Sequence, residues 1–107
     1  AEATGFSRFY PVPGMAHCSG GPATDQFDAL GALVDWVEKG RAPGALLATV
    51  NPVNPELPAN WSKTRSRPLC PWPQVAHYVD GDVESAASFR CALPTSWIIR
   101  CDSPCFS

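Results

Sequence analysis

Proline and glycine interrupt this chain too often for long regular elements to form. Its 107 residues include 12 prolines and 8 glycines, and both residue types tend to end helices and strands. The stretch from Asn51 to Pro58 carries repeated prolines and is predicted to be irregular. The sequence therefore predicts a loop-rich chain with few, short elements and room for one small domain at most.

Charge and hydropathy argue against two classes of partner. The 8 basic and 10 acidic residues give a net charge of −2 and form no runs, so no basic stripe is available for a phosphate backbone. No apolar stretch approaches the ~20 residues that span a bilayer. Residues 1–4 show neither the basic nor the apolar region of a signal peptide. We expect any such signal to have been removed or to belong to a longer precursor.

Cysteine usage predicts disulfides and no metal site. The five cysteines include no CxxC pair and no Cys/His pairs at zinc-finger spacing, which favours cross-links in an oxidising compartment. Because five is odd, at least one sulfur is either free or bonded outside the chain.

The clearest predicted element is a helix from about Gln26 to Lys39 with one face buried. Thr24 or Asp25 can cap its start, Asp28 adds favourable charge to the first turn, and Gly40 suits a left-handed end. A helix of this length depends on tertiary packing, so it needs a sheet to lie on. Apolar residues recur at three- and four-residue steps: Phe27, Leu30, Leu33, Val34 and Val37.

Short strands are predicted around this helix. Phe6–Val12 is rich in aromatic residues, and Pro11 would place that strand near a sheet edge. Residues 64–73 are predicted as a basic, proline-punctuated loop. Further elements are expected at Leu46–Val50 (strand), Gln74–Val79 (strand), Asp80–Asp82 (turn) and Val83–Phe89 (a helical turn or two). This inventory is incomplete for a domain, and the chain looks like a piece of an α/β structure.

The segment richest in chemistry is Val12–Pro22, with the sequence VPGMAHCSGGP. A strand, a Pro-Gly break, a lone histidine and then a helix fit the layout of α/β-hydrolases, where the triad histidine follows the last sheet strand. From such a loop an imidazole can take a proton from a serine hydroxyl while an acid holds its tautomer. His17 is therefore the candidate catalytic residue.

Three segments together resemble the C-terminal region of the tannase and feruloyl esterase family, secreted α/β-hydrolases of fungi and bacteria. The match runs roughly from Phe6 to Cys91, and each segment alone would be weak. The segments are PGMAHC followed by GGP, FDAL leading to LVDWVEKGRAP, and RSRPLCPWP followed by AASFRC.

The resemblance assigns roles to four of these residues. His17 matches the family's catalytic base, and Cys18 matches the cysteine that is disulfide-bonded to the residue before the catalytic serine. Cys70 and Cys91 match a second, local disulfide. The nucleophile, the acid, the lid and the calcium site lie upstream in family members, so no cofactor is expected in this chain. Residues 1–93 would be the last strand, the histidine loop and the last helices of the catalytic domain.

Residues 94–107 match no family pattern and are treated as a tail of unknown role. If Cys101 pairs with Cys105 in this tail, Cys18 is left to bond another polypeptide. That polypeptide would be the upstream portion or a second chain of the same enzyme, since some fungal members are cut into two disulfide-linked chains. A truncated product that never folds is a further interpretation.

The resemblance implies extracellular hydrolysis of phenolic-acid esters through an acyl-enzyme. Feruloyl esters are favoured over the galloyl esters of tannins, because the GGP and FDAL segments look more like the feruloyl branch. The alternative from another class is a small secreted, disulfide-rich binding module without catalysis. Such a module would fold alone and need no partner for Cys18.

Other chemically capable side chains have simpler explanations. His77 is expected to be a surface strand residue. Ser19 lacks a Gly-x-Ser-x-Gly elbow and stands too close to His17 in the chain to reach its imidazole. Cap, surface or packing roles are expected for Asp25, Asp28, Asp35 and Trp36.

Overall fold

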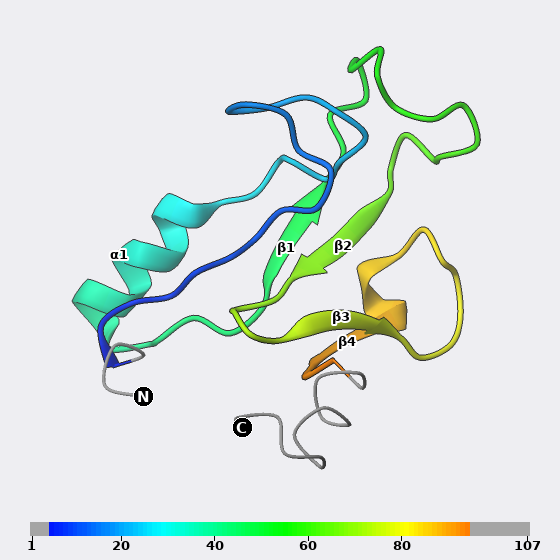
Figure 1. The fold of residues 1–107 in the computed structure, drawn as a ribbon. Coiled ribbons are helices and arrows are strands. Elements are labelled where there is room, and N and C mark those ends of the chain that lie inside the picture. Colours follow the sequence, from blue (N-terminus) through cyan, green and yellow to red (C-terminus); the bar gives the residue numbers. More distant parts are fainter. Residues whose placement is uncertain (1–4, 95–107) are drawn as a thin grey trace, which may run out of the picture.

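The computed structural model describes residues 5–94, which form one α-helix and two antiparallel two-stranded sheets (Figure 1). The first sheet pairs Leu46 with Leu69 and Thr49 with Ser66. The second pairs Val75 with Ala92. In chain order the elements are α1 (Ala29–Lys39), β1 (Leu46–Thr49), β2 (Ser66–Leu69), β3 (Val75–Tyr78), η2 (Ala86–Ser88, a 3₁₀ turn) and β4 (Phe89–Ala92).

Helix α1 ends where the sequence predicts but begins three residues late. Gly40 has a φ of 69° in the left-handed region, and its N–H donates to Trp36 O at 3.1 Å. The start differs because Gln26 exchanges two backbone hydrogen bonds with Thr49, at 3.0 and 2.9 Å, and is therefore extended. Asp28 then becomes the N-cap, and its Oδ1 accepts from Gly31 N at 2.8 Å. The prediction of Thr24 or Asp25 as the cap was wrong.

Two of the strand predictions and the helical turn are confirmed, and the expectation of a loop at residues 64–73 is wrong. β1 and β3 lie within the ranges expected for strands. Residues 64–73 contain β2 instead of being all loop. Pro68 faces Leu47 in the register, and its missing N–H is tolerated because β2 has a strand neighbour on one side only. Val83–Phe89 supplies the η2 turn and then the start of β4, a strand that the sequence did not indicate.

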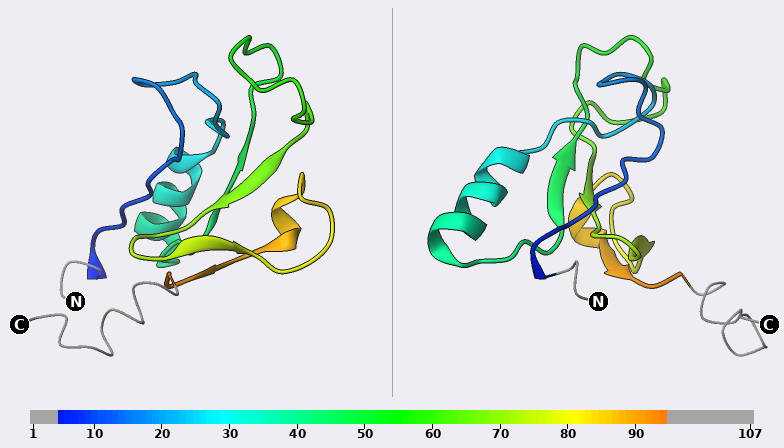
Figure 2. Two further views of the ribbon diagram at one scale, coloured as in Figure 1. Left: turned by 45° about the vertical axis from the view of Figure 1, so that its right-hand side comes forward. Right: turned by 60° about the vertical axis from the view of Figure 1, so that its left-hand side comes forward.

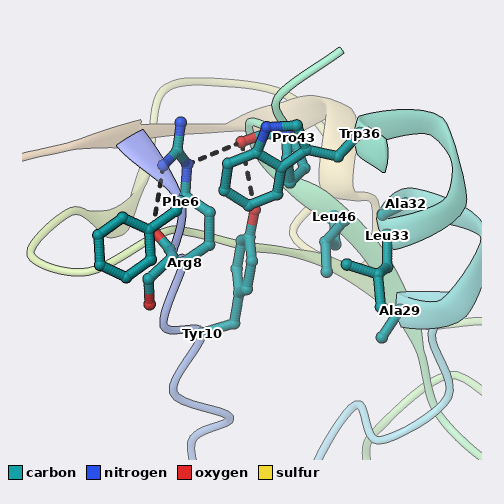
Figure 3. Close-up of a pocket in the computed structure, with 10 residues that line it drawn as sticks. Phe6, Arg8, Tyr10, Ala29, Ala32, Leu33, Trp36, Pro43 and Leu46 are labelled. Atoms are coloured by element: carbon teal, nitrogen blue, oxygen red, sulfur yellow. Dashed lines mark hydrogen bonds between the residues drawn. The ribbon is translucent and has the colours of Figure 1, made fainter. Parts of the chain in front are cut away.

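Phe6–Val12 is extended but forms no strand within the described residues. It runs past α1 and β1 (Figures 1 and 2) and is tied to the connection between them. The Tyr10 hydroxyl donates to Gly44 O at 2.6 Å, and Arg8 lies 4.8 Å above the Trp36 ring. Between this segment and α1 lies a cavity of about 340 Å³, shown in Figure 3.

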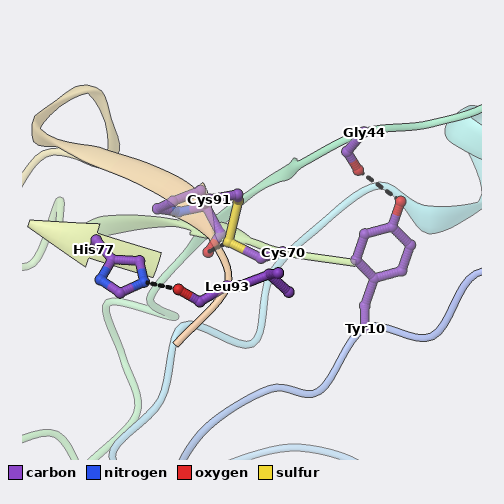
Figure 4. Close-up of a disulfide and its surroundings, with 7 residues drawn as sticks. Tyr10, Gly44, Cys70, His77, Cys91 and Leu93 are labelled. Atoms are coloured by element: carbon purple, nitrogen blue, oxygen red, sulfur yellow. Dashed lines mark hydrogen bonds between the residues drawn. A yellow bond between two sulfur atoms is a disulfide. The ribbon is translucent and has the colours of Figure 1, made fainter. Parts of the chain in front are cut away.

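The Cys70–Cys91 disulfide implied by the family resemblance is present (Figure 4). Cys70 directly follows β2, and Cys91 lies in β4. The cross-link therefore joins one sheet to the other, close to the fully buried Leu69. Cys101 and Cys105 lie outside the described residues, so their expected pairing stays a prediction.

The core is small, and the apolar face of α1 is open. No residue of α1 is buried, contrary to the expected buried face, and Leu30 and Val37 are 72% and 76% exposed. Phe6 and Phe9, on the neighbouring extended segment, are also exposed. No helix within residues 5–94 is long and apolar enough to cross a membrane. The buried apolar residues are Ala23, Ala48, Val50, Leu69 and Cys70.

The left-handed end of α1 gives a testable stability difference. Gly40→Ala should destabilise the fold by about 1 kcal/mol, because a side chain disfavours this backbone conformation. A Cβ there would meet no atom within 4 Å, so crowding adds nothing. Gly44→Ala is the matched control, since it also faces open space but lies outside the left-handed region. It should be neutral or slightly stabilising. Urea unfolding compares the two, and equal effects would contradict the explanation.

Candidate active site

The loop that carries His17 runs from Val12 to Ala23 and closes on itself through its backbone. A Cβ on Gly14 would lie 2.5 Å from Pro22 O, and a Cβ on Gly21 would collide with Gly14 O. Both glycines have positive φ, 77° and 75°. Across the tip, Ala16 N donates to Gly20 O at 3.1 Å. The two arms of the loop therefore touch at a spacing that no side chain allows.

His17 and Cys18 lie at the exposed tip of this loop. Cys18 Sγ is 3.3 Å from His17 Nδ1, and both residues are solvent-exposed. Cys18 has a φ of 70°, which is uncommon for a residue with a side chain and costs about 1 kcal/mol. This left-handed residue turns the chain directly after the histidine. Among the described cysteines, Cys18 is the one outside a disulfide.

Three side chains outside the tip hold the loop at Gly20 and Gly21. Asp25 Oδ2 accepts from Gly20 N at 2.7 Å. Glu56 Oε1 accepts from Gly21 N at 3.0 Å, and Asn54 Nδ2 donates to Gly21 O at 2.9 Å. Residues 51–62 belong to the connection between β1 and β2, here called the 51–62 connection. Figures 1 and 2 show it side by side with the His17 loop, beyond the same end of β1 and β2.

The backbone bond from Gly20 lowers the pKa of the Asp25 carboxyl below its ordinary range, against a smaller raising effect of burial. Asp25 is therefore a loop anchor, and the sequence prediction of a helix cap missed this role. Asn54 and Glu56 were also missed. They stand 33 and 35 residues from Gly21, in a stretch that the sequence marks only as irregular.

The other predicted side chains are not gathered at the loop tip. His77 lies on β3, where Nε2 is 3.1 Å from Leu93 O (Figure 4), as expected for a surface strand residue. Ser19 is exposed, and Asp35 pairs with Lys39 on α1 at 3.3 Å. Within residues 5–94 no group of three or more metal-binding side chains converges. An imidazole presented in this way can exchange protons, but needs a nucleophile and an orienting acid.

Comparison with known proteins identifies the class. The family described as "Tannase and feruloyl esterase" matches residues 1–92, and the chain belongs to this family. Its relatives are esterases, which places the chain in a family of carboxylic ester hydrolases.

Individual relatives agree with this assignment. The chain is 48% identical over 101 residues to mono(2-hydroxyethyl) terephthalate hydrolase of Piscinibacter sakaiensis, covering 86% of this chain and 15% of that protein. It is 36% identical over 94 residues to a probable feruloyl esterase of Arthroderma benhamiae, covering 86% and 17%. The crystal structure of an esterase from Aspergillus oryzae matches with a TM-score of 0.66 at 28% identity, covering 85% and 20%. The chain thus spans less than a fifth of either curated relative.

The lowered pKa of Asp25 predicts how the loop responds to acid. A carboxyl with a depressed folded-state pKa stabilises the fold fully above its ordinary value of about 3.9, and this stabilisation is lost as pH falls through the lowered pKa. Asp25→Asn removes the charge and keeps an acceptor oxygen. The unfolding free energy of wild type should therefore exceed that of Asp25→Asn by a constant amount above about pH 5, and the difference should shrink below about pH 4. A difference that grows in acid would contradict this role.

Proposed function

We propose that residues 1–93 are the C-terminal part of the catalytic domain of a secreted, serine-type α/β-hydrolase esterase, in which His17 is the general base. The observation that carries this proposal is the exposed His17 imidazole on a backbone-closed loop. That loop follows an extended segment and precedes α1. The order is the one in which α/β-hydrolases present their triad histidine.

In the proposed mechanism His17 moves protons for a serine supplied by upstream sequence. The imidazole takes the serine proton during attack on the ester carbonyl and delivers it to the departing alcohol, which leaves an acyl-enzyme. It then takes a proton from water, the acid is released, and the serine is reprotonated. An upstream carboxylate would accept from Nδ1 and fix the tautomer. The 107-residue chain alone carries no nucleophile elbow and is expected to be inactive.

Cys18 is proposed to form the disulfide that links the His17 loop to the segment carrying the catalytic serine. Its exposed sulfur lies 3.3 Å from the His17 ring, so a bond to a cysteine directly before the catalytic serine would fix the distance between base and nucleophile. Once bonded, the sulfur carries no proton that could compete for Nδ1. The upstream portion of the enzyme, or a second chain of it, supplies that partner cysteine.

The exposed apolar surface supports this incomplete-domain proposal over the independent binding module. On α1, the apolar side chains that recur with the spacing of a buried helix face are exposed to solvent, and Leu30 is 72% exposed. Covering such side chains stabilises a fold by about 1.5–3 kcal/mol each. A module that folds alone would gain this by burying them itself. We infer that the upstream portion of the enzyme covers them.

Esters of aromatic carboxylic acids are the proposed substrates. The relatives are named for feruloyl esters and for a terephthalate monoester, and both present an aromatic acid to the nucleophile. Feruloyl esters are our first candidate, in line with the GGP and FDAL segments. Terephthalate monoesters are the second, because identity to that hydrolase reaches 48%. The Cys70–Cys91 disulfide supports an extracellular location.

Substitution of His17 tests the catalytic assignment. In the complete esterase His17→Ala should lower kcat by about 10⁴-fold, as removal of a triad member does. His77→Ala is the control, because it removes a histidine of β3 that bonds Leu93 O. It should leave kcat unchanged. Initial rates on methyl ferulate decide the matter, and a His17→Ala enzyme with a tenth of normal activity would exclude His17 from the mechanism.

Peptide mapping without reduction tests the proposed role of Cys18. We expect its peptide to be joined to the peptide that contains the cysteine directly before the catalytic serine. Reduction should then cost more activity than global stability, because small displacements of reacting groups lower rates by about 100-fold. Recovery of Cys18 as a free thiol in the native enzyme, or joined to another cysteine of residues 1–107, would remove the proposed link.

A further inference from the structure

Gly21 is held on both of its backbone polar groups by one distant turn. Its N–H donates to Glu56 Oε1 at 3.0 Å, and its carbonyl accepts from Asn54 Nδ2 at 2.9 Å. Gly21 is buried, and Asn54 is only 8% exposed. Two successive peptide groups of the His17 loop are therefore fixed by side chains that come from outside the loop.

The turn that holds Gly21 is itself fixed by Asn54. Asn54 Oδ1 accepts from Glu56 N at 2.9 Å, and Asn54 N donates to Asn51 O at 3.0 Å. One amide side chain thus shapes its own turn with its oxygen and holds the loop with its nitrogen. Loss of its donor would leave the buried Gly21 carbonyl with fewer partners, which costs free energy.

Gly21 transmits this constraint to His17 through backbone contacts. Gly21 lies against Gly14 O in the other arm of the loop. Its neighbour Gly20 accepts from Ala16 N, the residue before His17, at 3.1 Å. The His17 side chain is exposed, so few contacts of its own fix its direction. The position of the imidazole therefore follows the backbone at Gly14, Gly20 and Gly21.

We propose that Asn54 and Glu56 are positioning residues for His17, here called the Gly21 clamp. This inference rests on the proposed role of His17 as the catalytic base. Neither clamp residue touches the reacting atoms. Each holds the loop so that the imidazole meets the serine at reacting distance, where an error of about 1 Å costs about 100-fold in rate.

The test measures kcat and KM of the complete esterase on methyl ferulate. Asn54→Asp removes the donor to Gly21 O while keeping the acceptor for Glu56 N, and Glu56→Ala removes the acceptor of Gly21 N. Each should lower kcat by about 10- to 100-fold and change KM by less than about threefold. Glu56→Gln keeps an acceptor oxygen and should recover most of the lost kcat.

Asn51→Ala is the matched control in the same turn. Its Oδ1 accepts from Val53 N at 3.3 Å, with no side-chain bond to the His17 loop. It should keep kcat within about threefold of wild type, even if its melting temperature falls as far as that of the clamp variants. If Asn54→Asp does not fold, the clamp is tested by comparing the kcat of Glu56→Ala with that of Glu56→Gln.

Two results would overturn the clamp. One is an unchanged kcat in Asn54→Asp and Glu56→Ala while His17→Ala is inactive, which separates this failure from failure of the proposed function. The other is an equal loss in Asn51→Ala, which would show a general effect of the turn on folding. An active His17→Ala enzyme would overturn the proposed function itself, and the clamp with it.

Discussion

The backbones of Gly14 and Gly21 approach too closely for any side chain to stand between them, and the loop around His17 depends on that contact. It brings the two arms of the loop together so that the histidine and the cysteine project from a narrow tip. Left-handed φ angles at both glycines make the close approach possible. A Cβ at Gly21 would push directly on the opposite arm. Gly14 and Gly21 are therefore structural necessities of the loop, whatever chemistry its tip performs.

Polar anchoring suits this loop better than apolar packing would. In the proposed mechanism its tip has to stay exposed, because a buried imidazole could not meet a substrate or a nucleophile supplied by upstream sequence. Charged and amide side chains at the base of the loop fix its backbone without covering the tip. Asp25 and Glu56 accept from adjacent amides, and charge-assisted bonds of this kind are stronger than neutral ones. The loop thus combines a fixed backbone with an open functional group.

Sequence reasoning succeeded where local chemistry decides the structure. The end of α1 at Gly40 follows from local backbone preference, and the irregular Asn51–Pro58 stretch follows from its prolines. It failed where a distant segment decides. Gln26 leaves the helix because it pairs with Thr49. Residues 66–69 become β2 because β1 offers a partner. The Cys70–Cys91 pairing came from family resemblance, since spacing alone does not determine connectivity.

The same distinction separates the two parts of the candidate site. His17 and Cys18 stand in one short motif, so the sequence brings them together without knowledge of the fold. Asn54 becomes visible only when the 51–62 connection and the histidine loop are seen at one end of the β1–β2 sheet (Figure 1). Residues that perform chemistry need particular side chains at particular spacings, whereas residues that hold a backbone need only a donor or acceptor within reach. The second requirement leaves almost no pattern in a single sequence. In this chain the residues that hold the backbone are therefore identified from the structure.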